Sequence, residues 1–157
     1  MKDFQRAYDI VIKMLSSYPR TIFEVRKKLR TKFFSEEIIS KVIKHCQEEK
    51  ILSDERYAEM WLENQLKYRP MGRILCCKKM LGRGLKIELV NKTLENYFDE
   101  EKEVSLAYNL ASGKIIELRH KSLTKKQITP KIGQYLNRKG FPENIIWNVL
   151  EKMDLLN

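Results

Sequence analysis

The feature that most constrains this chain is an internal repeat, because one pattern of apolar residues occurs three times. The segment 26–47 superimposes on two later segments so that Leu29, Met80 and Leu136 coincide. In the first copy the apolar positions are Ile38, Ile39, Val42, Ile43 and Cys46. Such spacing is typical of an amphipathic helix, and repetition of a unit of roughly 50 residues indicates a repeat architecture.

A short connector precedes the last helix of each copy. It reads Lys32-Phe33-Phe34 in the first copy, Arg83-Gly84-Leu85 in the second and Lys139-Gly140-Phe141 in the third. Glycine at such a position can end the preceding helix in a left-handed conformation. The shared connector therefore strengthens the assignment of the three copies to one helical module.

Start signals divide the first copy into three helices. Asp3 can cap the first helix, which ends at the break Tyr18-Pro19-Arg20. Thr21, with Glu24 three residues later, forms a capping box for the second helix. Ser35, followed by two glutamates, opens the third.

The other two copies repeat this plan. Ser53 caps the first helix of the second copy, and Arg69-Pro70-Met71-Gly72 breaks the chain before its middle helix. In the third copy we expect Gly113 to end the first helix and Thr129-Pro130 to start the next, with proline at the first helical position. The polar segment 113–128 is the expected hinge.

The sequence thus predicts an all-α fold of three tandem three-helix repeats, which form an elongated, curved array. No alternating β-branched run bounded by hairpin turns argues for a sheet. The expected boundaries place repeat 1 at residues 1–51, repeat 2 at 52–101 and repeat 3 at 102–157. Curvature is expected because stacked repeats generally rotate slightly from one to the next.

Composition favours a globular protein of the cytoplasm. Hydrophobic residues make up 43% of the chain and charged residues 33%, which is too apolar for a disordered segment. No apolar run reaches the length of a membrane span, and the start at Met1 leads into an amphipathic segment instead of a signal-peptide core. Three cysteines form neither a disulfide framework nor a paired zinc spacing. We expect Cys76 to be buried and Cys77 to be exposed.

Positive charge recurs with the repeat. The formal net charge is +10, and the segment 67–86 carries seven basic residues and no acidic one. A stacked array should then carry a basic stripe suited to a polyanion. The candidate residues for binding a partner or DNA are Arg20, Arg26, Arg56, Lys67, Tyr68, Arg69, Arg73, Lys78, Lys79, Arg83, Lys131, Arg138 and Lys139.

Two alternatives stay open for these residues. The lysines and arginines could merely solvate short helices. Tyr68 could stack on a base or pack on a partner, but a tyrosine packed into the turn is an equal interpretation.

Several short motifs resemble the RecX family of recombinase regulators, over about residues 7–153. Pro19-Arg20-Thr21 with the following Glu24–Leu29 is similar to the family's Arg-Ser-x-x-Glu-Leu-x-x-Lys-Leu element. Leu52–Ala58 is similar to Leu-Asp-Asp-x-x-Phe-Ala, and Arg69–Gly72 to an Arg-x-x-Gly turn. Leu136–Phe141 resembles Leu-x-Arg-Arg-Gly-Phe.

The resemblance implies a regulator that binds the RecA recombinase filament on single-stranded DNA and restrains its ATP hydrolysis and strand exchange. We also expect a monomer, and the lack of a long apolar run leads us to expect no membrane association. The chain departs from the family pattern at Ser53, Tyr57 and Phe33. Because Phe33 stands where the family usually has glycine, we expect the local turn there to differ.

No catalytic constellation is apparent, so we expect neither an enzyme nor a cofactor or metal site. The chain has no Gly-x-x-x-x-Gly-Lys phosphate loop, and His45 and His120 are far apart in sequence. Besides the filament regulator, two other classes remain. One is a direct DNA-binding protein of helix-turn-helix type, although acidic residues such as Glu36 and Glu88 begin its third helices. The other is a structural adaptor, which would leave the repeated basic charge without a use.

Overall fold

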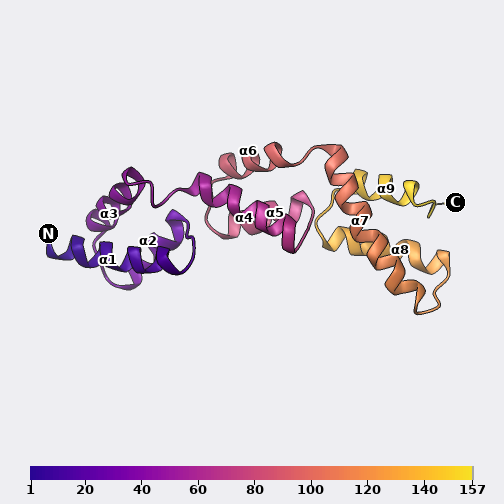
Figure 1. Cartoon of the computed structure of the whole chain (residues 1–157), viewed down its shortest axis with the longest axis horizontal. Helices are drawn as coiled ribbons and strands as arrows, with labels where there is room; N and C mark the ends of the chain where they lie inside the picture. Colours follow the sequence, from indigo (N-terminus) through magenta and orange to yellow (C-terminus); the bar gives the residue numbers. More distant parts are fainter. Residues whose placement is uncertain (157) are drawn as a thin grey trace. The chain divides into compact units, whose positions relative to one another are not determined.

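A computed structural model describes residues 1–156, and over these residues the chain forms nine α-helices and no strand (Figure 1). The all-α prediction is confirmed. In chain order the helices are α1 (Lys2–Ser17), α2 (Ile22–Thr31), α3 (Glu36–Glu48), α4 (Asp54–Tyr68), α5 (Arg73–Gly82), α6 (Ile87–Tyr97), α7 (Glu100–Arg119), α8 (Lys125–Arg138) and α9 (Glu143–Lys152). None of the helices in this range combines the length and apolar composition that a membrane span requires.

The helices follow the order of three modules, α1–α3, α4–α6 and α7–α9, but contacts group the chain into two compact units. Unit 1 contains Met1–Trp61 and Met80–Val90; unit 2 contains Leu62–Lys79 and the chain from Asn91 on. The middle module contributes helix segments to both units. The proposed repeat boundary after residue 101 falls in the first turn of α7. That each module is a domain of its own therefore stays a prediction.

In the first module, α3 packs on both α1 and α2. The apolar face predicted from the spacing in α3 is the buried one, and Cys46 lies at its end. Side chains that are fully buried in this core are Ala7, Val11, Val25, Leu29, Ile39, Val42 and Cys46. The helical spacing of the sequence thus identified the core of this module.

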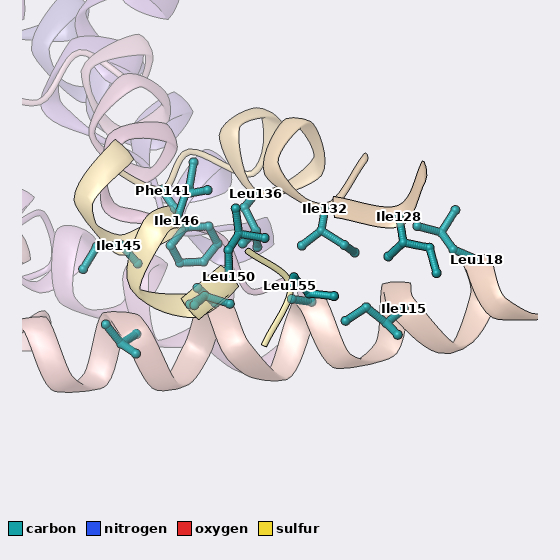
Figure 2. Close-up of a cluster of buried hydrophobic side chains, with 14 residues drawn as sticks. Ile115, Leu118, Ile128, Ile132, Leu136, Phe141, Ile145, Ile146, Leu150 and Leu155 are labelled. Carbon is teal, nitrogen blue, oxygen red and sulfur yellow. The ribbon is translucent and has the colours of Figure 1, made fainter. Parts of the chain in front are cut away.

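In the third module, α7 packs against both α8 and α9. Figure 2 shows Ile115 and Leu118 of α7 facing Ile128 and Ile132 of α8, with Leu150 of α9 in the same cluster. Leu136 is fully buried there, as Leu29 and Met80 are at the equivalent positions of the other modules. This equivalence was predicted from the repeat and is confirmed.

Most of the predicted helix starts are also present. Thr21 and Glu24 form both hydrogen bonds of a capping box. Ser35 accepts a hydrogen bond from the backbone N–H of Ile38, and Ser53 accepts one from that of Arg56. The assignment of Asp3 as a cap was wrong: α1 starts at Lys2, so Asp3 lies in its first turn.

Two element predictions in the third module were also wrong. Helix α7 does not end at Gly113 but continues to Arg119. The extra turns bury Ile115 and Leu118, and a Cβ atom at Gly113 would meet no atom within 4 Å, so nothing there requires glycine. The apolar face of the helix outweighs one residue of low helix propensity.

The next helix starts earlier than predicted. Thr124 and Gln127 form a capping box before Lys125, and Thr129-Pro130 lies inside α8. The expected hinge 113–128 is therefore mostly helical, with only residues 120–124 between α7 and α8. The cap that begins the helix is Thr124, whose backbone N–H donates to the Gln127 side chain, and not Thr129.

The three connectors form the same turn. Phe33, Gly84 and Gly140 all have a positive φ, of 63°, 82° and 86°. In each module the next residue's N–H reaches back to the carbonyl of the buried residue, as Phe34 does to that of Leu29 at 3.3 Å. The expectation that Phe33 would change the turn was wrong. The Phe33 side chain is 95% exposed and meets no steric obstacle. The only energetic cost of phenylalanine at this position is therefore its positive φ.

A second repeated feature connects successive modules, and we call it the joint. The N-terminus of a middle helix contacts two parts of the module that follows it. In unit 1 the backbone N–H of Ile22 donates to Asp54 at 2.9 Å, and the Thr21 hydroxyl donates to the carbonyl of Arg83 at 2.7 Å. Both acceptors belong to the second module.

Unit 2 contains the equivalent joint. The backbone N–H of Arg73 donates to Glu103 at 3.2 Å, and that of Gly72 donates to the carbonyl of Lys139 at 2.7 Å. Here the donor to the carbonyl of the turn is a backbone N–H, whereas in unit 1 it is the Thr21 hydroxyl. The same bonding pattern thus occurs in both joints, although the donor groups differ.

Both joints require glycine in the turn that receives the helix. A Cβ atom on Gly84 would lie 2.3 Å from the Cβ of Phe23, and one on Gly140 would lie 2.3 Å from the Cβ of Leu75. Gly72 is equally confined, because its Cβ would lie 2.4 Å from the backbone of Gly140. The positive φ explains only part of the preference for glycine; the close approach explains the rest.

We expect Leu136→Ala to lower the free energy of unfolding by about 2–5 kcal/mol, because the side chain is fully buried. Denaturant titration followed by circular dichroism would measure this. Leu81→Ala is the matched control, since Leu81 is 41% exposed and should lose less than about 1 kcal/mol. An effect below about 0.5 kcal/mol at Leu136 would contradict its place in the core.

Glu103 makes the joint of unit 2 sensitive to pH. Its side chain is buried, and burial raises its pKa above the ordinary value of 4.5. The folded state therefore holds the proton more tightly than the unfolded state, and the resulting stability decreases as the pH rises through the raised pKa. Glu103→Gln retains an oxygen that can accept from Arg73 but cannot ionise.

We therefore expect the unfolding free energy of wild type, relative to Glu103→Gln, to decrease as the pH rises above 4.5. Chemical denaturation at a series of pH values would measure the difference. Glu117→Gln is a control of opposite sign, because the neighbouring Lys114 lowers the pKa of Glu117. A difference that stays constant or grows with pH would refute the role given to Glu103.

Candidate functional site

Unit 2 contains a hollow of ≈ 760 Å³ beside its joint. Four helices and the break between α4 and α5 contribute to it. The lining residues are Gln65, Tyr68, Arg69, Pro70, Met71, Leu75, Lys79, Leu110, Lys114, Tyr135, Arg138 and Lys139. We call this hollow the basic groove, because five of these residues are basic and none is acidic.

The joint brings the two ends of the basic groove together. Arg69 and Pro70 come just before the N-terminus of α5, while Arg138 and Lys139 end α8 and enter the following turn. The hydrogen bond from the Gly72 N–H to the carbonyl of Lys139 holds these two segments together. Residues far apart in sequence thus line one hollow.

Tyr135 lies between two cations of the groove. The ammonium of Lys114 is 5.6 Å from the centre of its ring, and that of Lys139 is 5.8 Å away. Lys114 also forms an ion pair with Glu117 at 3.0 Å, outside the groove lining. The ring and the ion pair hold these long side chains in place before any ligand binds.

Tyr68 presents a second ring at the break between α4 and α5. It is 69% exposed, and the ammonium of Lys67 lies 5.2 Å from the ring centre. The interpretation of Tyr68 as a residue packed into the turn does not fit this exposure. An exposed ring with cations beside it can stack on a nucleic-acid base or pack on another protein.

Of the predicted binding residues, the groove brings together Tyr68, Arg69, Lys79, Arg138 and Lys139. Lys67 adjoins it through Tyr68. Lys78 and Lys131 are exposed but do not line it. The side chain of Arg73 lines a separate, smaller hollow beside Cys77.

Two predicted residues are occupied by contacts within the protein. Arg26 forms an ion pair with Glu36 at 3.0 Å, and Arg83 forms one with Glu24 at 3.2 Å. The carbonyl of Arg83 also belongs to the joint of unit 1. These arginines have structural partners, which composition alone does not reveal.

Sequence reasoning missed Lys114 and Tyr135 in the groove. Lys114 lies beyond Gly113, where we expected the helix to have ended. Tyr135 directly precedes the buried Leu136, as Lys79 precedes Met80 in the second module, so the repeat alignment carried a signal for it.

Histidine and cysteine side chains form no candidate reactive centre in the described part of the chain. No three histidine, cysteine or acidic side chains between residues 1 and 156 are grouped to hold a metal ion. His45 packs against the rings of Phe4 and Tyr8. Cys76 is buried as expected, and burial raises its pKa to about 12; Cys77 is half-buried, not exposed as predicted.

Comparison with known proteins supports the resemblance seen in the motifs. A family model described as the first three-helix domain of RecX matches residues 7–46. The regulatory protein RecX of Lactococcus lactis subsp. lactis (strain IL1403) is 30% identical over 97% of this chain and 56% of the relative. That of Clostridium beijerinckii is 26% identical over 97% of this chain and 70% of the relative.

The chain is similar in sequence to RecX proteins over 97% of its length. The crystal structure of RecX from Lactobacillus salivarius has the same fold, with a TM-score of 0.88, 24% sequence identity and 99% coverage of both chains. The chain spans about half the length of the Lactococcus relatives it matches.

The segments whose motifs resemble the RecX pattern lie at the joints and the groove. Leu52–Ala58 includes Asp54, whose carboxylate accepts from α2. Arg69–Gly72 is the break that lines the basic groove, and Leu136–Phe141 contains the turn that meets it. In this chain the same segments therefore set the joints and the candidate site.

Proposed function

We propose that this chain binds the RecA recombinase filament on single-stranded DNA and modulates, mainly inhibits, its ATP hydrolysis and strand exchange. It acts as a monomer in the cytoplasm and needs no cofactor. The basic groove is the observation that carries the proposal. The relatives of this chain are proteins named regulatory protein RecX. The groove supplies a surface suited to a DNA-loaded partner.

The groove suits a phosphate backbone for two reasons. Arg69, Lys79 and Arg138 are exposed cations, and no ion pair engages them within residues 1–156. Release of counterions from DNA then favours binding at low salt. Tyr68 and Tyr135 add rings beside these cations, and stacking of bases on such rings tolerates any sequence.

The competing proposal is direct binding to duplex DNA in helix-turn-helix fashion. A recognition helix there would bring its N-terminal residues into the major groove. The third helix of the first module begins with Glu36 and Glu37, and Glu36 is held by Arg26 and Arg30. Carboxylates at this position cannot donate hydrogen bonds to phosphate, which favours the filament proposal.

We expect the triple variant Arg69→Glu, Lys79→Glu, Arg138→Glu to weaken inhibition of RecA ATP hydrolysis at least about tenfold, with a flatter salt dependence. Its stability should stay close to that of wild type, because the three side chains are exposed. The measurement is ATP hydrolysis by RecA on single-stranded DNA, at increasing concentration of the variant and at several salt concentrations.

The matched control is Lys13→Glu, Lys92→Glu, Lys152→Glu, which changes the net charge equally at exposed positions outside the groove. It should inhibit nearly as well as wild type. Equal loss in both triple variants would show that net charge alone matters, and unchanged inhibition by the groove variant would place recognition elsewhere. Binding to bare single-stranded DNA as tight as to the filament would support direct DNA binding instead.

A further inference from the structure

Unit 1 contains a second hollow whose lining differs in kind from that of the basic groove. It has a volume of ≈ 400 Å³ and lies between the end of α1, the break after it and α4. Most of its walls are apolar, and it has two guanidinium groups. The walls include Leu15, Ile51, Tyr57 and Met60, and the positive charge comes from Arg20 and Arg56. We call it the arginine pocket.

Arg20 lacks the partner that a cation in this position needs. Its Nε atom is buried and has no hydrogen-bond acceptor among the described residues. The guanidinium carbon of Arg20 lies 5.8 Å from the centre of the Tyr18 ring, which is a cation–π contact. A buried donor left without an acceptor destabilises the fold, so its presence calls for an explanation.

The neighbouring carboxylates are engaged elsewhere. Glu24 accepts from the N–H of Thr21 and pairs with Arg83, and Asp54 accepts from the N–H of Ile22. Neither lines the pocket. The folding of unit 1 therefore uses its nearby negative charges at the joint and leaves Arg20 without one.

Arg56 adds the second positive charge. Its guanidinium donates to the carbonyl of Lys50 and forms no ion pair within residues 1–156. That bond occupies one Nη atom, while the other N–H groups of the planar guanidinium remain for an anion. Two arginines on one hollow provide the donors that a carboxylate binds most strongly.

We propose that the arginine pocket binds a carboxylate that is flanked by apolar side chains, on a segment of a protein partner. Apolar walls favour such a segment over a nucleic-acid backbone, which carries a phosphate at every step and has no aliphatic side chains. The basic groove has the opposite character, with five basic residues and two tyrosines. The inference goes beyond the proposed function, because the pocket recognises protein without DNA.

The test uses the whole chain and two matched probes, N-acetyl-Leu-Glu-Leu-amide and N-acetyl-Leu-Gln-Leu-amide. The NMR signal of the Arg20 Nε–H group, assigned by its absence in Arg20→Met, reports on the pocket directly. We expect the glutamyl peptide to shift this signal with saturation, at a concentration at least about tenfold lower than any effect of the glutaminyl peptide. Arg56→Met should weaken the response to the glutamyl peptide.

Three outcomes would overturn the proposal: no shift of the Arg20 signal, equal shifts with both peptides, or a larger shift with a single-stranded oligothymidylate at lower concentration. A stability measurement on Arg20→Met gives an independent arm. Because the Nε atom has no acceptor, we expect an unchanged or higher melting temperature. A clearly lower one would show that Arg20 serves the fold and would overturn its assignment to a ligand. Since none of these measurements involves RecA, failure here leaves the proposed function standing, and failure of that function leaves this inference standing.

Discussion

An α-helix begins with backbone N–H groups that no carbonyl of its own can reach, and this requirement governs how the modules meet. At α2 and α5 the acceptors of these N–H groups come from the following module: the carboxylates of Asp54 and Glu103 and the carbonyl of Lys139. The carbonyl of Arg83 accepts from the Thr21 hydroxyl instead. The carboxylates are favoured there twice, by the hydrogen bond and by the helix dipole. Burial opposes this by raising the pKa of both.

The joint also requires small residues in the turn that receives the helix. A helix end that donates to the carbonyl of a turn must approach the backbone of that turn closely, and Gly84 and Gly140 permit this in the two joints. Phe33 has the same backbone conformation, but its side chain is 95% exposed, so no helix of residues 1–156 packs on it. The same turn thus carries glycine where a helix meets it and a large side chain where none does.

The joint of unit 2 is also what forms the basic groove, since Lys139 contributes both its carbonyl to the joint and its side chain to the groove. The joint of unit 1 has a different consequence. It engages Asp54, and Glu24 pairs with Arg83, while the Nε atom of Arg20 has no hydrogen-bond acceptor among the described residues. The two units therefore contain hollows of different character, one rich in cations and one more apolar with two arginines.

The sequence predicted what depends on local periodicity and capping. The buried faces around Leu29, Met80 and Leu136 and the capping box at Thr21 follow from spacing alone. It could not predict the course of α7 through Gly113, because the apolar face that continues the helix forms only against α8 and α9.

The site was predictable in part for a similar reason. Basic composition pointed to Arg69 and Arg138, but it did not distinguish them from Arg26 and Arg83, whose charges are neutralised by Glu36 and Glu24. Which cations stay available depends on tertiary contacts. Lys114 was missed because the helix that carries it was expected to end one residue earlier.

The most direct test of the joint compares Gly140→Ala with Gly82→Ala by the free energy of unfolding. Gly140 has a positive φ and meets Leu75, so we predict that alanine there destabilises the chain by at least about 2 kcal/mol. Gly82 ends α5, and a Cβ there meets no atom within 4 Å, so alanine should be neutral or stabilise by up to about 1 kcal/mol. Similar effects of the two substitutions would contradict the close approach on which the joint, and with it the basic groove, depends.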